Sequence, residues 1–107
     1  MQLIIAIKSD LNNFDTAYNF IDTVTTEKDH LIKMVFFYQD STYMLLNSYI
    51  NNKWVDLLKK YNLPGFICVS SCKKRGISKD NIKPPFQASS IIEFINNAEI
   101  VDRVVCL

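Results

Sequence analysis

The sequence predicts an α/β protein, with a three-layer α/β/α sandwich around a mainly parallel sheet of four to five strands. Two observations support this prediction. Short apolar segments rich in Val, Ile and Phe recur along the chain, and segments with a helical spacing of apolar residues lie between them. Strands that alternate with helices form parallel sheets covered on both faces. A length of 107 residues fits a single domain, residues 1–107.

Four apolar segments are expected to be strands: Leu3–Ile7, Leu31–Tyr38, Phe66–Ser70 and Val101–Leu107. They are largely apolar and do not alternate cleanly between apolar and polar residues. This pattern is typical of strands that are buried on both faces of a parallel sheet.

The first helix is expected after the first strand, because apolar residues there recur at intervals of three and four. These residues are Phe14, Ala17, Tyr18, Ile21 and Val24. Asn12 and Asn13 supply capping chemistry, and Asp15 suits the first turn.

Two further helices are expected. The first occupies the region from Tyr43 to Tyr61, with Asn51-Asn52 as a candidate interruption, and its apolar face holds Trp54, Leu57, Leu58 and Tyr61. The second begins with a capping box of Ser90 and Glu93, and its apolar stripe is Ile91, Phe94, Ile95 and Ala98. The segment Lys83-Pro84-Pro85 is expected to be an extended loop that leads into this last helix.

The charge is balanced overall but unevenly distributed. The net charge is +1, with −3 in residues 1–56 and +4 in residues 57–107. Five positive residues and one negative residue fall between Lys73 and Lys83, which forms a small basic patch without an aromatic platform. Direct nucleic-acid binding is therefore not expected. The chain has no apolar run long enough to span a membrane and no signal-peptide pattern, so we expect a cytoplasmic protein.

The segment FICVSSCKKRG, Phe66–Gly76, carries the candidate chemistry. Cys68 is expected near the carboxyl end of a strand, where open α/β sheets bind ligands. Ser70 or Ser71 could cap a helical turn there, with Cys72 inside the turn. Free backbone N–H groups at that turn, together with Lys73, Lys74 and Arg75, would favour a thiolate over a thiol. By residue type alone, Cys68 and Cys72 are more often small buried hydrophobes. For Cys106, in the apolar run RVVCL, we expect packing.

Other chemistries are not indicated. A zinc site would need His30 together with all three cysteines, and the chain has no C-x-x-C pair to anchor it. With two glycines in total, a glycine-rich phosphate-binding loop is excluded. We therefore expect no metal and no cofactor.

Several blocks of the sequence, in this order, resemble the DsrE/TusD sulfur-carrier family. They are VFFYQD (Val35–Asp40), Trp54, ICVSSCKKRGI (Ile67–Ile77), FQASSIIEFI (Phe86–Ile95) and DRVV (Asp102–Val105). The resemblance implies a DsrEFH-like fold and a sulfur relay. The cysteine in the position of Cys68 would accept sulfane sulfur as a persulfide and pass it to another protein, which calls for an exposed cysteine.

The resemblance also implies partners and supporting residues. Family members exchange sulfur with other sulfur-carrier proteins, in tRNA 2-thiouridine formation or in sulfur oxidation, and work as homo- or hetero-oligomers of related subunits. Lys74 and Arg75 match the family's basic pair, and Tyr38 and Asp40 match a strand end expected beside the site. Lys73 precedes the basic pair.

Cys72 and two shortened loops depart from the family pattern. Cys72 is either a second thiol that resolves a persulfide on Cys68 or a packing residue, and we favour packing. Two other functions stay open. One is a non-catalytic structural or interaction subunit of such an oligomer. The other is a dithiol redox protein using Cys68 and Cys72, although redox pairs usually have two intervening residues and this pair has three.

Overall fold

The computed structural model describes residues 1–9 and 14–107. Its strands are β1 (Gln2–Ile7), β2 (Leu31–Phe37), β3 (Gly65–Cys68), β4 (Phe86–Ser89) and β5 (Arg103–Cys106). Its α-helices are α1 (Phe14–Thr26), α2 (Ser48–Lys60), α3 (Val69–Lys74) and α4 (Ile91–Ala98). Two 3-10 helices complete the described part, η2 (Gln39–Leu46) and η3 (Lys79–Asn81).

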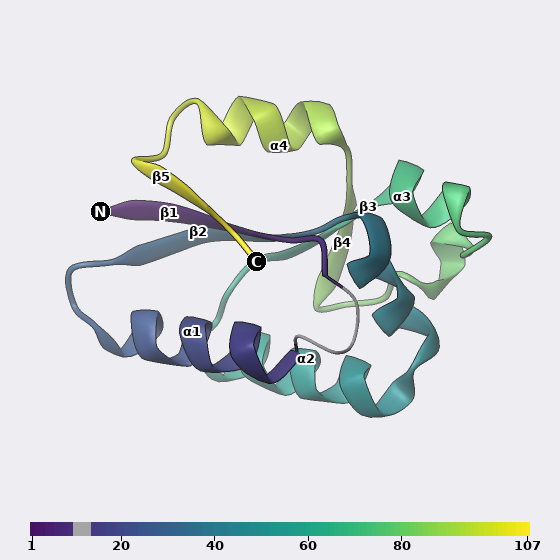
Figure 1. Cartoon of the computed structure of the whole chain (residues 1–107), viewed down its shortest axis with the longest axis horizontal. Coiled ribbons are helices and arrows are strands. Elements are labelled where there is room, and N and C mark those ends of the chain that lie inside the picture. The colour runs from purple at the N-terminus through teal and green to yellow at the C-terminus, as the bar shows by residue number, and fades with distance from the viewer. Residues whose placement is uncertain (10–13) are drawn as a thin grey trace.

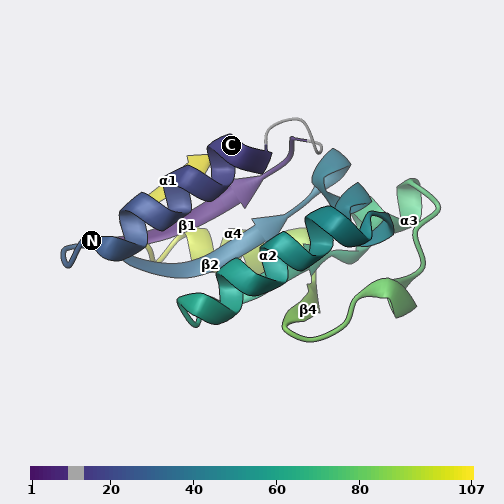
Figure 2. The same cartoon turned by 90° about the horizontal axis from the view of Figure 1, so that it is seen from below.

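The five strands form one sheet in the order β4-β3-β2-β1-β5, and every pair is parallel. Helices α1 and α2 cover one face of the sheet and α4 covers the other (Figure 1). The same arrangement is seen from below in Figure 2, where α1 and α2 lie side by side in front of the strands. The predicted three-layer fold with a parallel sheet is confirmed.

The core has two parts, one on each face of the sheet. The larger part lies against α1 and α2 and includes Ile5, Val35, Phe37, Ile67, Ile21, Trp54 and Leu57. The smaller part lies against α4 and consists of Ile4, Met34, Phe36 and Cys68. Neighbouring residues of one strand belong to opposite parts because side chains alternate between the two faces. Because both faces of the sheet bury apolar residues, the strand segments do not alternate between apolar and polar residues in the sequence.

The second predicted helix is two elements. Asn47 interrupts the region, because its side-chain Oδ1 accepts a hydrogen bond from the backbone N–H of Ile50 at 3.1 Å and so caps α2. The predicted interruption at Asn51-Asn52 is wrong, since both residues lie inside α2.

The last helix is capped as predicted but packs differently. Ser90 Oγ accepts a hydrogen bond from the backbone N–H of Glu93 at 3.2 Å. The Glu93 carboxylate, however, accepts from the Ser89 hydroxyl at 3.0 Å. Of the predicted stripe, Phe94 and Ala98 pack against the smaller core, whereas Ile91 is 40% and Ile95 48% exposed.

Strand β4 was not predicted. It has four residues, FQAS, and too few apolar side chains to be distinguished from a loop by sequence. Pairing with β3 makes it a strand, because the edge of β3 offers backbone hydrogen bonds from Gly65 to Cys68. The predicted caps Asn12 and Asn13 lie outside the described residues.

Candidate functional site

Cys68 lies at the carboxyl end of the sheet, as predicted. It is the last residue of β3, it pairs with Ser89 of β4, and α3 begins at the next residue. Cys68 itself therefore occupies the N-cap position of α3, and Ser70 and Ser71 lie in its first turn. The prediction that one of these serines caps the helix is wrong. The side chain of Cys68 is also 0% exposed, where the family resemblance called for an exposed cysteine.

Two serines surround the thiol and change its acidity. Sγ of Cys68 lies 3.2 Å from Oγ of Ser70, within hydrogen-bond distance. Burial raises the pKa of the Cys68 thiol, but the polar hydroxyl and amide groups of the neighbouring Ser70 and Ser71 lower it by more. The net result is a pKa below the ordinary thiol value, because these polar groups stabilise the charged form.

The structure does not place the basic residues Lys73, Lys74 and Arg75 as the groups that lower the pKa of Cys68. Lys73 and Lys74 are exposed on α3. Arg75 forms an ion pair with Asp40, with Nε and Nη2 each 3.0 Å from Oδ1 of the carboxylate. The Arg75 guanidinium lowers the pKa of Cys72, although burial, the largest influence, leaves that pKa raised overall. In the part of the chain that the structure describes, the groups that lower the pKa of Cys68 are the serines.

The turn after β2 contacts the first turn of α3. The backbone N–H of Gln39 donates a hydrogen bond to Oγ of Ser71 at 2.9 Å. Gln39 has a φ of 52°, in the left-handed region that residues other than glycine rarely adopt. Arg75 Nη1 donates to the backbone carbonyl of Ser71 at 3.2 Å. Gln39, Asp40, Ser71 and Arg75 thus tie the ends of β2 and β3 together.

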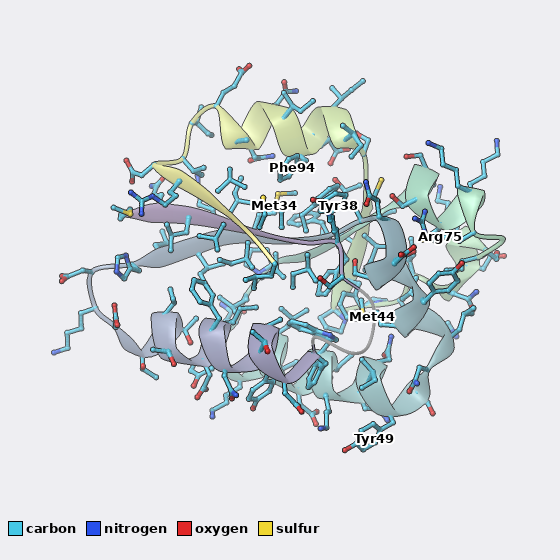
Figure 3. The ribbon with its side chains drawn as sticks, in the orientation of Figure 1. Met34, Tyr38, Met44, Tyr49, Arg75 and Phe94 are labelled. Atoms are coloured by element: carbon cyan, nitrogen blue, oxygen red, sulfur yellow. The ribbon has the colours of Figure 1, made fainter. Side chains whose placement is uncertain are left out.

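Tyr38 lies on the same face of the sheet as Cys68. It stacks on Phe36, with ring centroids 5.7 Å apart, and Phe36 stacks in turn on Phe94 of α4 at 4.7 Å. Figure 3 shows Tyr38, Met34 and Phe94 between the sheet and α4, with Arg75 beside α3 and Met44 on the opposite face. Burial raises the pKa of the Tyr38 hydroxyl, and negative charge on the Cys106 sulfur raises it further.

The two neighbouring cysteines lie in different environments. Cys68 belongs to the small core under α4, whereas Cys72 is 1% exposed in the larger core with Ile77 and Phe86. Burial raises the pKa of Cys72, and negative charge on the neighbouring Cys68 sulfur raises it further. This placement suits the packing interpretation of Cys72, because a raised pKa keeps it a thiol.

Cys106 does not pack as predicted. It is exposed on β5 and is a free thiol, as are Cys68 and Cys72. Its neighbours Val105 and Leu107 pack against the larger core. Alternation along the strand therefore turns Cys106 to the other face, where α4 does not cover it.

Sequence reasoning missed two contributors to the site. Gln39 was not considered, because glutamine carries no turn signal and its positive φ depends on the surrounding structure. Ser71 was considered only as a helix cap. The run of two serines directly after the cysteine, Ser70-Ser71, was the available signal that hydroxyl groups surround the thiol.

In residues 1–9 and 14–107 we find no helix with the length and apolar character needed to cross a membrane.

Comparison with known proteins gives consistent matches. The model of the DsrE/DsrF-like family matches residues 1–107. The chain is 34% identical to the DsrE protein of Allochromatium vinosum, over 85% of this chain and 84% of that protein. It is 28% identical to the sulfurtransferase TusD of Buchnera aphidicola, over 87% of each chain. It is also similar in structure to the YchN protein of E. coli, with a TM-score of 0.72, 16% identity and full coverage of both chains.

Proposed function

Because this chain belongs to the DsrE/DsrF-like family, we propose that it is a sulfur-relay protein that carries sulfane sulfur as a persulfide on Cys68. The observation that supports this role is the environment of Cys68. The thiol lies at the carboxyl end of β3, and the polar groups of two serines lower its pKa despite its burial. Sulfur acceptance requires a thiolate, and a lowered pKa increases the fraction of the thiol that is ionised at a given pH.

The proposed transfer is a thiol–persulfide exchange. The Cys68 thiolate attacks the outer sulfur of a persulfide on a donor protein. The donor's S–S bond breaks, a new S–S bond forms on Cys68, and the donor leaves as a thiolate that takes up the proton released from Cys68. One S–S bond replaces another, so the step needs no oxidant.

A buried thiol must be uncovered before it can meet a donor. Cys68 is 0% exposed, and the aromatic ring of Phe94 on α4 packs against the same small core. None of the eight residues of α4, all of them described by the structure, is buried. Movement of α4 would therefore expose little buried apolar surface. We propose that this movement gives a donor access to Cys68.

The Buchnera aphidicola relative bears the name sulfurtransferase TusD, which supports sulfur-carrier proteins as upstream donor and downstream acceptor. We propose that the chain assembles with copies of itself or with related subunits, and that it serves tRNA 2-thiouridine formation or sulfur oxidation. The exposed Lys73 and Lys74 would attract an acidic surface of a partner.

The complete burial of Cys68 favours a second candidate function. A cysteine with 0% exposure in an apolar cluster is also what a non-catalytic structural subunit would show. The two functions differ in one measurable property, which is whether Cys68 accepts sulfur.

Intact-mass measurement after incubation with a persulfide donor separates them. A relay protein gains the mass of one sulfur atom, and a reductant removes it. The Cys72→Ser variant should still take up sulfur, and the Cys68→Ser variant should not. Failure of the wild-type protein to gain sulfur would leave the structural subunit. Loss of two hydrogens that requires both cysteines would indicate a redox pair instead.

A further inference from the structure

We propose that α4 cannot keep its packed position when Cys68 carries an added sulfur atom, so that loading displaces α4 and the loaded and empty proteins present different surfaces. The loading itself rests on the proposed function, whereas the steric coupling between Cys68 and α4 does not. Access for a donor needs only a brief opening, but a loaded Cys68 would keep α4 displaced after the donor has left.

No space for another atom adjoins the Cys68 thiol. Its side chain is 0% exposed, so no gap of the size of a water molecule lies beside it, either at the surface or inside the protein. A persulfide places a second sulfur atom one bond beyond Sγ. Protein interiors are close-packed, so an added atom of that size requires a neighbouring group to move.

The sheet beside the thiol is held on both sides. Cys68 pairs with Ser89 of the edge strand β4, and β3 pairs with β2 through Ile67 and Phe37. Phe36 of β2, which shares the small core with Cys68, is 0% exposed. Backbone hydrogen bonds between the strands would have to break before β2 and β3 could separate. The sheet is therefore an unfavourable place to make room.

The first turn of α3 is also held. The thiol lies 3.2 Å from the hydroxyl of Ser70 in this turn. The hydroxyl of Ser71 accepts a hydrogen bond from the Gln39 backbone N–H at 2.9 Å, and its carbonyl accepts one from Arg75 at 3.2 Å. Arg75 is in turn paired with Asp40 at 3.0 Å. These contacts tie α3 to the turn after β2, so α3 resists displacement.

Helix α4 is held more weakly than the sheet and α3. None of its eight residues, all within the described part of the chain, is buried, and Phe94 and Ala98 pack against the small core (Figure 3). Its first turn is close to the thiol, because Ser89, the pairing partner of Cys68, directly precedes the N-cap Ser90. A helix of eight residues is not stable in water without packing, so a displaced α4 would lose its helical structure.

Displacement of α4 would distinguish the loaded carrier from the empty one. In the empty protein the thiol is covered, which protects it from oxidants. In the loaded protein the outer sulfur is open to an acceptor. The acceptor's thiolate attacks that sulfur, the S–S bond on Cys68 breaks as a new one forms on the acceptor, and Cys68 leaves as a thiolate. Helix α4 then closes over it again.

Substitutions at Cys68 test the steric coupling without any sulfur donor. Cys68→Met supplies a longer side chain that mimics the bulk of a persulfide, and Cys68→Ser keeps the size of the thiol. Carbon-13 Cα chemical shifts in the full-length protein report whether a segment is helical. Relative to Cys68→Ser, Cys68→Met should remove more than about half of the helical Cα shift of residues 91–98, because overfilling the small core favours the displaced helix. Residues 48–60 of α2 should keep their helical shifts.

Cys72→Met is the matched control, because it adds the same bulk to the larger core on the other face of the sheet. It should leave the helical shifts of α4 unchanged. Cys68→Val adds less bulk and takes the place of Cys68→Met if that variant does not fold. The proposal is overturned if α4 keeps its helical shifts in these Cys68 variants, as it would if the longer side chain escaped past the exposed Ser70. Equal losses in α2 and α4 would also overturn it.

The sulfur-loaded protein is tested with glutathione persulfide in a Cys106→Ser background, which removes the exposed thiol. Intact mass measures uptake, and the Cα shifts of α4 are compared before and after loading. Uptake on Cys68 with unchanged α4 shifts would contradict the coupling. No uptake, together with loss of the α4 helix in Cys68→Met, would refute the relay function and leave the steric coupling standing.

Discussion

The two faces of the sheet differ in how firmly they are covered. On one face, α1 and α2 lie side by side (Figure 2), and each is 13 residues long. They bury side chains along their length, including Phe14, Ile21, Trp54 and Leu57. On the other face, the eight-residue helix α4 covers a core of four buried residues. Cys72 lies in the firmly covered core and Cys68 in the lightly covered one. Because α1 and α2 bury more apolar side chains than α4, we expect most of the stability to come from their face and the α4 face to open more easily.

The largest expected effect is on the firmly covered face. Trp54 is 3% exposed and makes edge-to-face contacts with Phe14 and Phe37, at centroid distances of 5.1 and 5.0 Å. Trp54→Ala should lower the free energy of unfolding by about 3–5 kcal/mol, because it leaves a cavity in the larger core. Chemical denaturation measures the loss. A loss smaller than that of Phe94→Ala would contradict the comparison.

The matching substitution on the other face is Phe94→Ala. It removes the stack on Phe36 from a partly buried position, so we expect a loss of about 1–3 kcal/mol. It should also speed the alkylation of Cys68, because less of α4 then covers the thiol. Mass mapping of iodoacetamide-treated protein measures that rate. Ile92→Ala is the control on the same helix, because Ile92 is 71% exposed and points away from the core. An unchanged Cys68 rate in Phe94→Ala would show that α4 does not limit access.

A smaller effect is expected at the turn beside the site. Gln39→Gly keeps the backbone N–H that contacts Ser71 and removes the side chain that makes a φ of 52° unfavourable. We expect a gain of about 0.5–1 kcal/mol in the free energy of unfolding, reduced by the greater freedom of glycine in the unfolded chain. The pKa of the Cys68 thiol should not change, because the contact of the residue 39 N–H with Ser71 is kept. Thermal unfolding measures the gain, and a clear loss of stability would mean that the glutamine side chain itself is needed.

The smallest expected effect is a pH dependence of opposite sign for the two cysteines. The pKa of Cys68 is lower in the folded protein than in the unfolded chain. Ionisation of Cys68 therefore stabilises the fold above the unfolded thiol pKa, which is about 8.5. This stabilisation is lost as the pH falls through the pKa of Cys68 in the folded protein. The pKa of Cys72 is raised, mainly by burial, so its contribution is present below the unfolded pKa and is lost as the pH rises through the folded value.

Denaturation of serine variants from neutral to alkaline pH tests this contrast. Relative to the wild-type protein, Cys68→Ser should lose stability toward alkaline pH, and Cys72→Ser should gain it. Profiles that change in the same direction would contradict the opposite environments of the two thiols.

Much of the fold was predictable because apolar content and periodicity reflect burial directly. The continuous apolar segments at Leu3–Ile7 and Leu31–Tyr38 identified strands buried on both faces. The helical spacing around Trp54 identified the face that α2 buries. Strand β4 was not predictable in this way, because its four residues become a strand by pairing with β3. The orientation of α4 was also missed, since its isoleucines fit a helical stripe and yet stay exposed.

The sequence by itself determined the parallel α/β fold and the position of Cys68 at the end of a strand, because both depend on local patterns of apolar residues. Only the tertiary structure decided how Cys68 is surrounded. Cys68 is buried under α4, which lies far from it in the chain, and Cys72 lies on the opposite face of the sheet. The hydrogen bond between Gln39 and Ser71 also connects residues that are distant in the sequence. A pKa depends on such neighbours, so residue types alone indicated a basic patch where the structure shows two serines.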